Sequence, residues 1–172
     1  ETSGSLNILL CDKTGTLTKG QPEVKNIEVT SSISEDQLIA MVASVEKHSQ
    51  HPLARSILNE AFKRNIHVTT AEQFQSVTGK GAYGMVNGEK ILVGSSSWIA
   101  KLVPIGNELQ QIIDSWANEG HSIIVAANEG EIIGIISVSD SIREEASHTI
   151  EQLRQIGIEE TVMLTGDSAP TA

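Results

Sequence analysis

Residues 12–18 have the types and spacing of a loop that could accept a phosphoryl group. They follow an apolar stretch that predicts a buried parallel strand, so Asp12 is expected at the strand's carboxyl end. In open α/β sheets ligands bind at that end, and Gly15 lets the backbone come close to an anion. An aspartate can take the group covalently, while Lys13 and free backbone N–H groups hold its oxygens. The sequence therefore predicts phosphoryl transfer through an aspartyl-phosphate.

The run Asp-Lys-Thr-Gly-Thr-Leu-Thr at residues 12–18 resembles the phosphorylation motif of the P-type ATPases, cation pumps built on the haloacid dehalogenase fold. The resemblance implies that Asp12 is the catalytic nucleophile, with Lys13 and Thr14 as catalytic neighbours. It also implies that Asp12 and the backbone carbonyl of Thr14 hold Mg²⁺. For Asp12 alone a plain turn is the alternative, because Asp-Lys-Thr-Gly also suits structural loops.

A second polar loop at Thr165, Gly166 and Asp167 follows another apolar stretch. The tripeptide is a weak signal by itself. Read with the first motif, it resembles the Thr-Gly-Asp of the P-type family, which implies three catalytic residues, with Thr165 holding the phosphoryl group. Asp140 with Arg143 resembles the family's acidic-then-Arg segment near the hinge and the nucleotide ribose. Taken alone, Asp140 would be a helix cap.

Residues 46–54 place an acid and an imidazole where one predicted helix ends and another begins. Such groups can hydrogen-bond an adenine edge, although composition alone favours solvated capping roles for Glu46, His48 and His51. Ser-x-His-Pro-Leu after a Glu resembles the nucleotide-binding signature of the heavy-metal-transporting P-type ATPases. The resemblance implies that Glu46 and His51 contact adenine, and it leaves His48 at the surface.

Gly79, Gly81 and Gly84 make a formal G-x-G-x-x-G. A dinucleotide fold would need a helix directly after it, whereas Asn87 and Gly88 predict the tight turn of a hairpin. In the heavy-metal pumps a Gly-x-Gly at this place lines the ATP pocket. The resemblance therefore carries over to Gly79 and Gly81, but not to Gly84.

Composition narrows the classes of function. The chain has 172 residues and a formal charge of −10, which argues against nucleic acid as a partner. Its single cysteine, Cys11, excludes a disulfide framework and suits a reducing compartment. The histidines lack ligand spacing with cysteine, so no copper or zinc site is predicted. Since no apolar run approaches the roughly 18 residues of a membrane span, we expect this stretch to be soluble.

Hydrophobic periodicity predicts strands and helices that end at these motifs. Ser34 begins a capping box, Pro52 suits the first turn of a helix that turns Phe62 inward, and Asn107 suits a third helix as its cap. The predicted strands are residues 8–11, 24–30, 83–86, 89–93, 122–127, 131–138 and 160–164, and the predicted helices are residues 34–47, 52–62, 107–120 and 141–156.

This order predicts an α/β fold in which a parallel-sheet unit is interrupted by an antiparallel sheet flanked by helices. Residues 1–23 would begin a haloacid dehalogenase-like phosphorylation domain, residues 24–136 would form an α+β nucleotide-binding domain, and residues 137–172 would continue the phosphorylation domain. The family's later Gly-Asp-Gly-x-Asn-Asp segment is not in the sequence. We therefore expect an incomplete phosphorylation domain, and a fragment that binds ATP with little or no turnover.

The resemblance extends from Asp12 to Asp167 and implies the ATP-binding, aspartyl-phosphate-forming part of a heavy-metal export pump. ATP and Mg²⁺ would be its cofactors, and the pump's transmembrane and actuator domains its partners at the cytoplasmic face of a membrane. The missing transmembrane part would bind the metal ion.

The amino-acid sequence of residues 49–54, 155–158 and 163–167 resembles that of the zinc, cadmium and lead exporters more than that of the copper exporters. Copper exporters are the alternative. A soluble haloacid dehalogenase-type phosphatase is another, but such enzymes usually place a general-acid Asp where this chain has Thr14. A nucleotide-binding module without turnover is a third.

Overall fold

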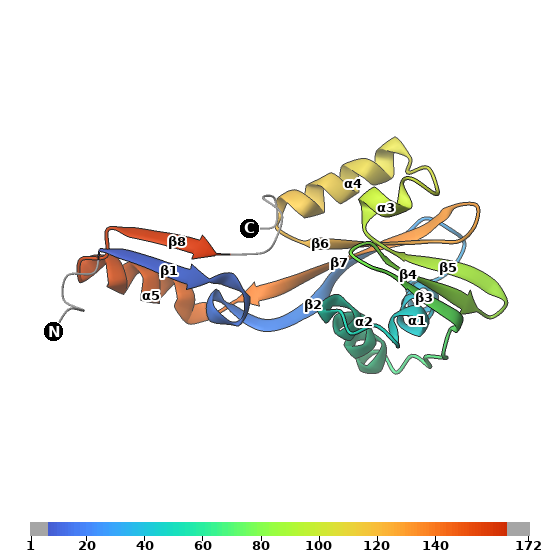
Figure 1. The fold of residues 1–172 in the computed structure, drawn as a ribbon, viewed down its shortest axis with the longest axis horizontal. Coiled ribbons are helices and arrows are strands. Elements are labelled where there is room, and N and C mark those ends of the chain that lie inside the picture. Colours follow the sequence, from blue (N-terminus) through green and yellow to red (C-terminus); the bar gives the residue numbers. More distant parts are fainter. Residues whose placement is uncertain (1–6, 165–172) are drawn as a thin grey trace. The chain divides into compact units, whose positions relative to one another are not determined.

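The computed structural model describes residues 7–164, which divide into two compact units. Residues 7–22 and 140–164 belong to the first unit, and residues 23–139 form the second. Two neighbouring strands, β2 (Thr18–Val29) and β7 (Ile132–Ile142), contain residues of both units (Figure 1). The chain thus leaves the first unit along β2 and returns to it along β7.

The first unit, as far as it is described, is a parallel pair of strands with one helix and one helical turn. Its elements besides the ends of β2 and β7 are β1 (Ile8–Asp12), the π-helical turn η2 (Lys13–Leu17), α5 (Glu144–Gln155) and β8 (Glu160–Leu164). Ile8 is opposite Glu160 and Asp12 is opposite Leu164, so the two strands end together. The predicted parallel strands at residues 8–11 and 160–164 are confirmed.

The expectation that the first strand is buried is wrong for the described residues. The side chains of Ile8 and Leu10 are 52% and 61% exposed. Because successive side chains of a strand point to opposite faces, these two share one face, and Leu9 and Cys11 share the other. One face of β1 is therefore exposed and the other, with Leu9 and Cys11, is half-buried.

The second unit is a six-stranded sheet, among the described residues, with the strand order β2-β7-β6-β5-β4-β3. Neighbouring strands from β3 to β7 pair antiparallel, which confirms the predicted antiparallel sheet with flanking helices. The remaining elements are α1 (Glu35–Glu46), α2 (Pro52–Lys63), β3 (Glu72–Val77), β4 (Gly81–Val86), β5 (Glu89–Gly94), α3 (Ser96–Ile99), α4 (Asn107–Asn118) and β6 (Ser122–Ala127).

Two hydrophobic cores lie on opposite faces of this sheet. In β5, Ile91 and Val93 pack with α1 and α2, whereas Leu92 packs with α3 and α4. In Figure 1 the first helix pair lies below the sheet and the second above it. The period-2 alternation of side chains along a strand is what supplies both cores from one sequence.

The helix ends agree with the capping signals at two of three positions. Ser34 and Gln37 form the reciprocal capping box, with N···O distances of 3.2 and 2.8 Å, and Pro52 is the first residue of α2. The third expectation is wrong by one residue, because Gly106 caps α4 and Asn107 is already helical. Phe62 is also a correction: it is 84% exposed because it lies one step around the helix from the buried Ala61.

The hairpin predicted from Asn87 and Gly88 is confirmed between β4 and β5. The two residues have φ values of 53° and 83°, as a primed turn requires. Two corrections concern the elements around Arg143: β7 continues to Ile142, and α5 begins at Glu144 rather than near residue 141. Of the helices in residues 7–164, none has the length and apolar character needed to cross a membrane.

Candidate functional site

Asp12 is exposed at the carboxyl end of β1, directly before the turn η2. Within the turn the Gly15 N–H donates to the Thr18 hydroxyl over 3.1 Å, and that hydroxyl lies 3.2 Å from the Lys13 carbonyl. Gly15 has φ +79°, a conformation that glycine adopts without a steric cost. The turn is thereby closed by its own residues and leaves the Asp12 carboxylate at the surface.

Asp140 of β7 holds the far side of this loop. Its carboxylate accepts hydrogen bonds from the Thr18 hydroxyl, from the Gly20 N–H at 3.0 Å and from the Gln21 N–H at 3.1 Å. Since Asp140 lies in a strand, the plain interpretation of it as a helix cap is wrong. A carboxylate that accepts from two backbone N–H groups fixes the chain that follows residues 12–18.

Arg143 donates hydrogen bonds to three backbone carbonyls of the same loop. Its Nε donates to the Thr18 carbonyl over 3.0 Å, and its Nη2 donates to the Gly15 carbonyl over 3.1 Å. The backbone N–H of Arg143 donates to the Leu17 carbonyl over 2.9 Å. The guanidinium therefore contacts the loop itself, and a contact with the nucleotide ribose stays a prediction. Thr18, 2% exposed, is the member of the loop that sequence reasoning left without a role.

The other residues predicted for this centre are placed less completely. Lys13 is half-buried in η2, and the backbone of Thr14 belongs to the same turn. Thr165, Gly166 and Asp167 lie outside the described residues. Among the described residues no cluster of three or more His, Cys, Asp or Glu side chains could hold a metal ion.

Glu46 is the last residue of α1 and is only 9% exposed. Burial raises the pKa of its carboxyl above the ordinary value, and a hydrogen bond from the Ser49 side chain and the interaction with His51 act against that rise. A buried carboxylate with few water contacts is a strong acceptor for an N–H group of a ligand.

His51 caps α2, and its ring Nδ1 accepts the Leu53 N–H over 3.2 Å. A neutral imidazole that accepts at Nδ1 carries its proton on Nε2, which can then donate outward. Adenine offers an amino group and ring nitrogen acceptors, so the acceptor at Glu46 and the donor at His51 match its edge. His48 is exposed, with its ring centroid 5.5 Å from that of Phe74.

Gly79 and Gly81, the two glycines predicted to line the ATP pocket, lack a side chain for different local reasons. Gly79 has φ +68° in the turn between β3 and β4, and no described atom lies within 4 Å of a Cβ placed there. At Gly81 a Cβ would come within 2.1 Å of the Val93 carbonyl oxygen and 2.9 Å of the Trp98 ring. The absence of a side chain at Gly81 is therefore explained by strand packing, whereas Gly79 leaves open space beside its backbone.

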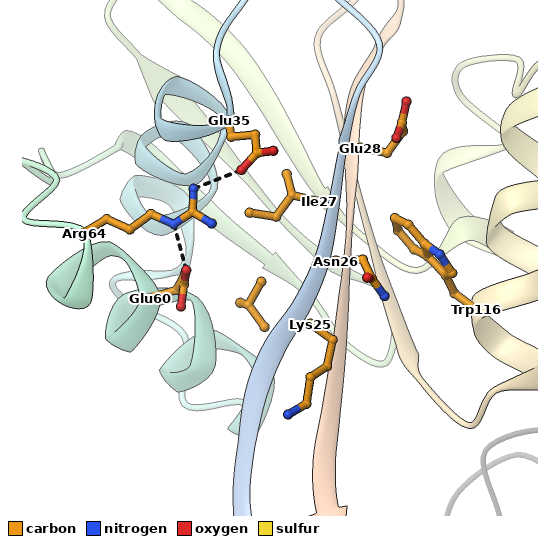
Figure 2. Close-up of a pocket in the computed structure, with 9 residues that line it drawn as sticks. Lys25, Asn26, Ile27, Glu28, Glu35, Glu60, Arg64 and Trp116 are labelled. Carbon is orange, nitrogen blue, oxygen red and sulfur yellow. Dashed lines mark hydrogen bonds and ion pairs between the residues drawn. The ribbon is translucent and has the colours of Figure 1, made fainter.

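A pocket of about 470 Å³ lies along β2, and none of the predicted site residues lines it (Figure 2). Arg64 crosses it from α2, with its Nε 2.7 Å from Glu60 and its Nη1 3.0 Å from Glu35 of α1. These hydrogen bonds raise the pKa of the Arg64 guanidinium. Because Arg64 is already paired with carboxylates, the pocket does not suit a triphosphate. The ion pair between Arg64 and Glu35 joins the end of α2 to α1.

The haloacid dehalogenase-like hydrolase family matches residues 6–172 of the sequence. This chain belongs to the haloacid dehalogenase-like hydrolase family. In this haloacid dehalogenase-like chain, the predicted α/β fold with an inserted antiparallel sheet is confirmed, and Asp12 occupies the strand end where the sequence predicted a nucleophile.

The relatives of this haloacid dehalogenase-like chain are metal-transporting ATPases, as the resemblance predicted. It is 38% identical to a probable cadmium-transporting ATPase of Alkalihalophilus pseudofirmus and 37% identical to a cadmium-transporting ATPase of Staphylococcus aureus, in each case over 100% of this chain. It is also 38% identical, over 98% of this chain, to the copper-exporting P-type ATPase B of Archaeoglobus fulgidus. The chain spans 24% of the length of each of these relatives.

Solved structures of ATPases also match this haloacid dehalogenase-like chain. A zinc-transporting PIB-type ATPase in the E2.Pi state matches with a TM-score of 0.79 and 31% identity, over 98% of this chain and 27% of that one. The catalytic CPx-ATPase domain CopB-B matches with a TM-score of 0.66 and 25% identity, over 96% of this chain and 54% of that one.

Proposed function

We propose that this chain is the ATP-binding and aspartyl-phosphate-forming portion of an ATP-driven heavy-metal export pump, at the cytoplasmic face of a membrane. The observation that carries the proposal is the exposed Asp12 at the end of a parallel strand, on a loop held by Asp140 and Arg143. The identity to cadmium- and copper-transporting ATPases supports it. The pump's transmembrane and actuator domains are the partners that this proposal requires.

In the proposed reaction a carboxylate oxygen of Asp12 attacks the γ-phosphorus of ATP. The new O–P bond forms as the bond to the β–γ bridging oxygen breaks, and ADP leaves. Lys13 and Thr165 neutralise and orient the transferred oxygens, because positioning and charge stabilisation are the main contributions to phosphoryl transfer. The carboxylate of Asp12 and the carbonyl of Thr14 are the hard oxygen ligands that suit Mg²⁺, which supplies charge neutralisation when bound.

The nucleotide is proposed to lie with adenine at Glu46 and His51 and with its phosphates near Gly79 and Gly81. The buried acceptor at Glu46 and the Nε2–H donor at His51 support the adenine assignment. Asp140 and Arg143 bond to the loop after Asp12 through their side chains, and their contact with the ribose remains part of the proposal.

For the transported ion we propose zinc, cadmium or lead. The cadmium-transporting relatives and the zinc-transporting structure support this choice, and the copper-exporting relative at 38% identity supports copper as the second candidate. The test is ATP hydrolysis by the full-length pump in vesicles, measured with each metal ion in turn. Stimulation by monovalent copper alone would exclude the zinc, cadmium and lead assignment.

The nucleotide assignment is tested by calorimetric titration of ATP and AMP into the 172-residue chain, with and without Mg²⁺, against Glu46→Ala. We expect binding that persists without Mg²⁺ and is lost in the variant. Failure of the unaltered chain to bind either nucleotide, together with hydrolysis of p-nitrophenyl phosphate, would favour the soluble phosphatase instead.

A further inference from the structure

We propose that Ser49 is the positioning residue of the adenine site, because it is hydrogen-bonded both to the end of α1 at Glu46 and to the backbone of His51. This inference rests on the proposed function, which makes Glu46 and His51 the pair that recognises adenine. The nucleotide would contact those two side chains, and Ser49 would act through them.

Two hydrogen bonds place Ser49 between the two recognition groups. Its backbone N–H donates to the Glu46 carbonyl over 2.8 Å, which ties it to the end of α1. Its hydroxyl oxygen accepts the His51 N–H over 3.3 Å. The Ser49 side chain also lowers the pKa of the Glu46 carboxyl, against the effect of burial. A hydroxyl has one donor and two acceptor positions, so the Ser49 hydroxyl can accept from His51 and still donate toward Glu46.

The segment between the helices gives Ser49 this role because its other members have little packing. Lys47 and Gln50 are exposed, whereas Ser49 is half-buried. The Ser49 side chain therefore links the end of α1 to the cap of α2, and the His51 ring is then fixed by the Leu53 N–H. Without the hydroxyl, the backbone N–H of His51 would lose its acceptor at the start of α2, and the His51 ring would be less well positioned.

The sharpest test compares Ser49→Ala with Ser49→Thr in ATP titrations of the 172-residue chain without Mg²⁺. We expect Ser49→Ala to weaken ATP binding by about tenfold, equivalent to about 1.4 kcal/mol, because the variant removes the acceptor of the His51 N–H. Ser49→Thr keeps the hydroxyl and should restore affinity to within about threefold of the parent. Ser49→Gly removes the same hydroxyl and is measured beside Ser49→Ala, in case either variant folds poorly.

The matched control is Ser44→Ala, in the same helix as Glu46. The Ser44 hydroxyl is buried and bonds to the Ala40 carbonyl over 2.7 Å and to the Thr69 hydroxyl over 3.1 Å, away from the adenine pair. The Ser44→Ala variant therefore measures the effect of a general destabilisation of α1 on ATP binding. The second readout is the ring nitrogen chemical shifts of His51 by NMR, which Ser49→Ala should move and Ser44→Ala should leave in place.

The outcomes separate this inference from the proposed function. Loss of affinity in Ser49→Ala, with recovery in Ser49→Thr and no loss in Ser44→Ala, supports the positioning role. Parent-like binding by Ser49→Ala, while Glu46→Gln and His51→Gln bind weakly, overturns the inference and leaves the adenine site in place. Equal losses in Ser49→Thr or in Ser44→Ala also overturn it. Parent-like binding by both Glu46→Gln and His51→Gln overturns the proposed adenine site itself.

Discussion

Replacing Gly81 by alanine should destabilise the second unit even when no nucleotide is present. The added Cβ would lie 2.1 Å from the Val93 carbonyl oxygen, 2.6 Å from the Gly94 Cα and 2.9 Å from the Trp98 ring. Two of these neighbours are backbone atoms of β5, which pairs with β4 at this position. They cannot rotate away as the end of a flexible side chain could.

The magnitude follows from the distance to the carbonyl oxygen. A carbon and a carbonyl oxygen approach favourably to about 3.3 Å, so β4 and β5 would have to separate by roughly 1 Å. Overpacking of this kind costs about 1–3 kcal/mol, and each weakened ladder hydrogen bond adds about 1 kcal/mol. We expect Gly81→Ala to lower the free energy of unfolding by about 3 kcal/mol and the melting temperature by roughly 12 °C.

The assay is urea unfolding of the 172-residue chain, followed by circular dichroism, with two glycine controls. Gly130→Ala should be close to neutral, because the nearest described atom to its Cβ is 3.9 Å away. Gly79→Ala should cost about 1–2 kcal/mol through its positive φ alone. A Gly81→Ala variant within about 0.5 kcal/mol of the parent, the ordinary range of surface changes, would refute the packing argument.

Three further predictions concern the loop after Asp12, the proposed adenine site and the contact between α1 and α2. Thr18→Val should cost about 2 kcal/mol and speed amide exchange in the loop after Asp12, because Asp140 loses a buried hydroxyl donor. Glu46→Gln should melt above the parent at pH 7, since the raised pKa of Glu46 means that the folded state is favoured when this carboxyl is protonated. Its advantage should shrink as the pH falls toward 4.5, the ordinary value for a glutamate. Arg64→Met should cost about 1 kcal/mol in low salt, by loss of the ion pairs that join α1 to α2, and less in high salt.

Each of these has an outcome that contradicts it. Unchanged hydrogen exchange at the Gly20 and Gln21 amides in Thr18→Val would show that Asp140 holds the loop without the hydroxyl. A Glu46→Gln advantage that grows as the pH falls would reverse the sign of the argument. An equal loss for Arg64→Met at low and high salt would assign its effect to packing of the aliphatic stem rather than to charge.

Local signals account for what could be predicted from the sequence. The capping box at Ser34 and the turn at Asn87 and Gly88 depend on residues within three positions of each other, and the structure has both. β3 (Glu72–Val77) had no such signal, because its residues are mostly exposed and Gln73 interrupts the ladder with φ +50°. The four-residue α3 is too short for any helical period to appear.

The candidate site likewise has residues that local sequence predicts and residues whose role depends on distant contacts. Asp12 could be found because the motif and its strand are adjacent in sequence. The part that Asp140 plays could not, since the Thr18 side chain that it bonds to is 122 residues away along the chain. Gly81 shows a third case, in which a resemblance named the residue but the packing of β5 and Trp98 supplies a physical reason that the sequence alone does not contain.

The hydrogen bonds between Asp140 and the loop after Asp12 also set an order of folding. Closing a chain segment of 122 residues costs about 4 kcal/mol in entropy before any contact is made. Pairing of β2 with β7, as in the bond from the Asn26 N–H to the Ser137 hydroxyl, brings the two ends together and leaves only a few residues to close. We therefore expect the loop after Asp12 to become ordered after the second unit has folded, so that a destabilising change far from Asp12 can affect this loop.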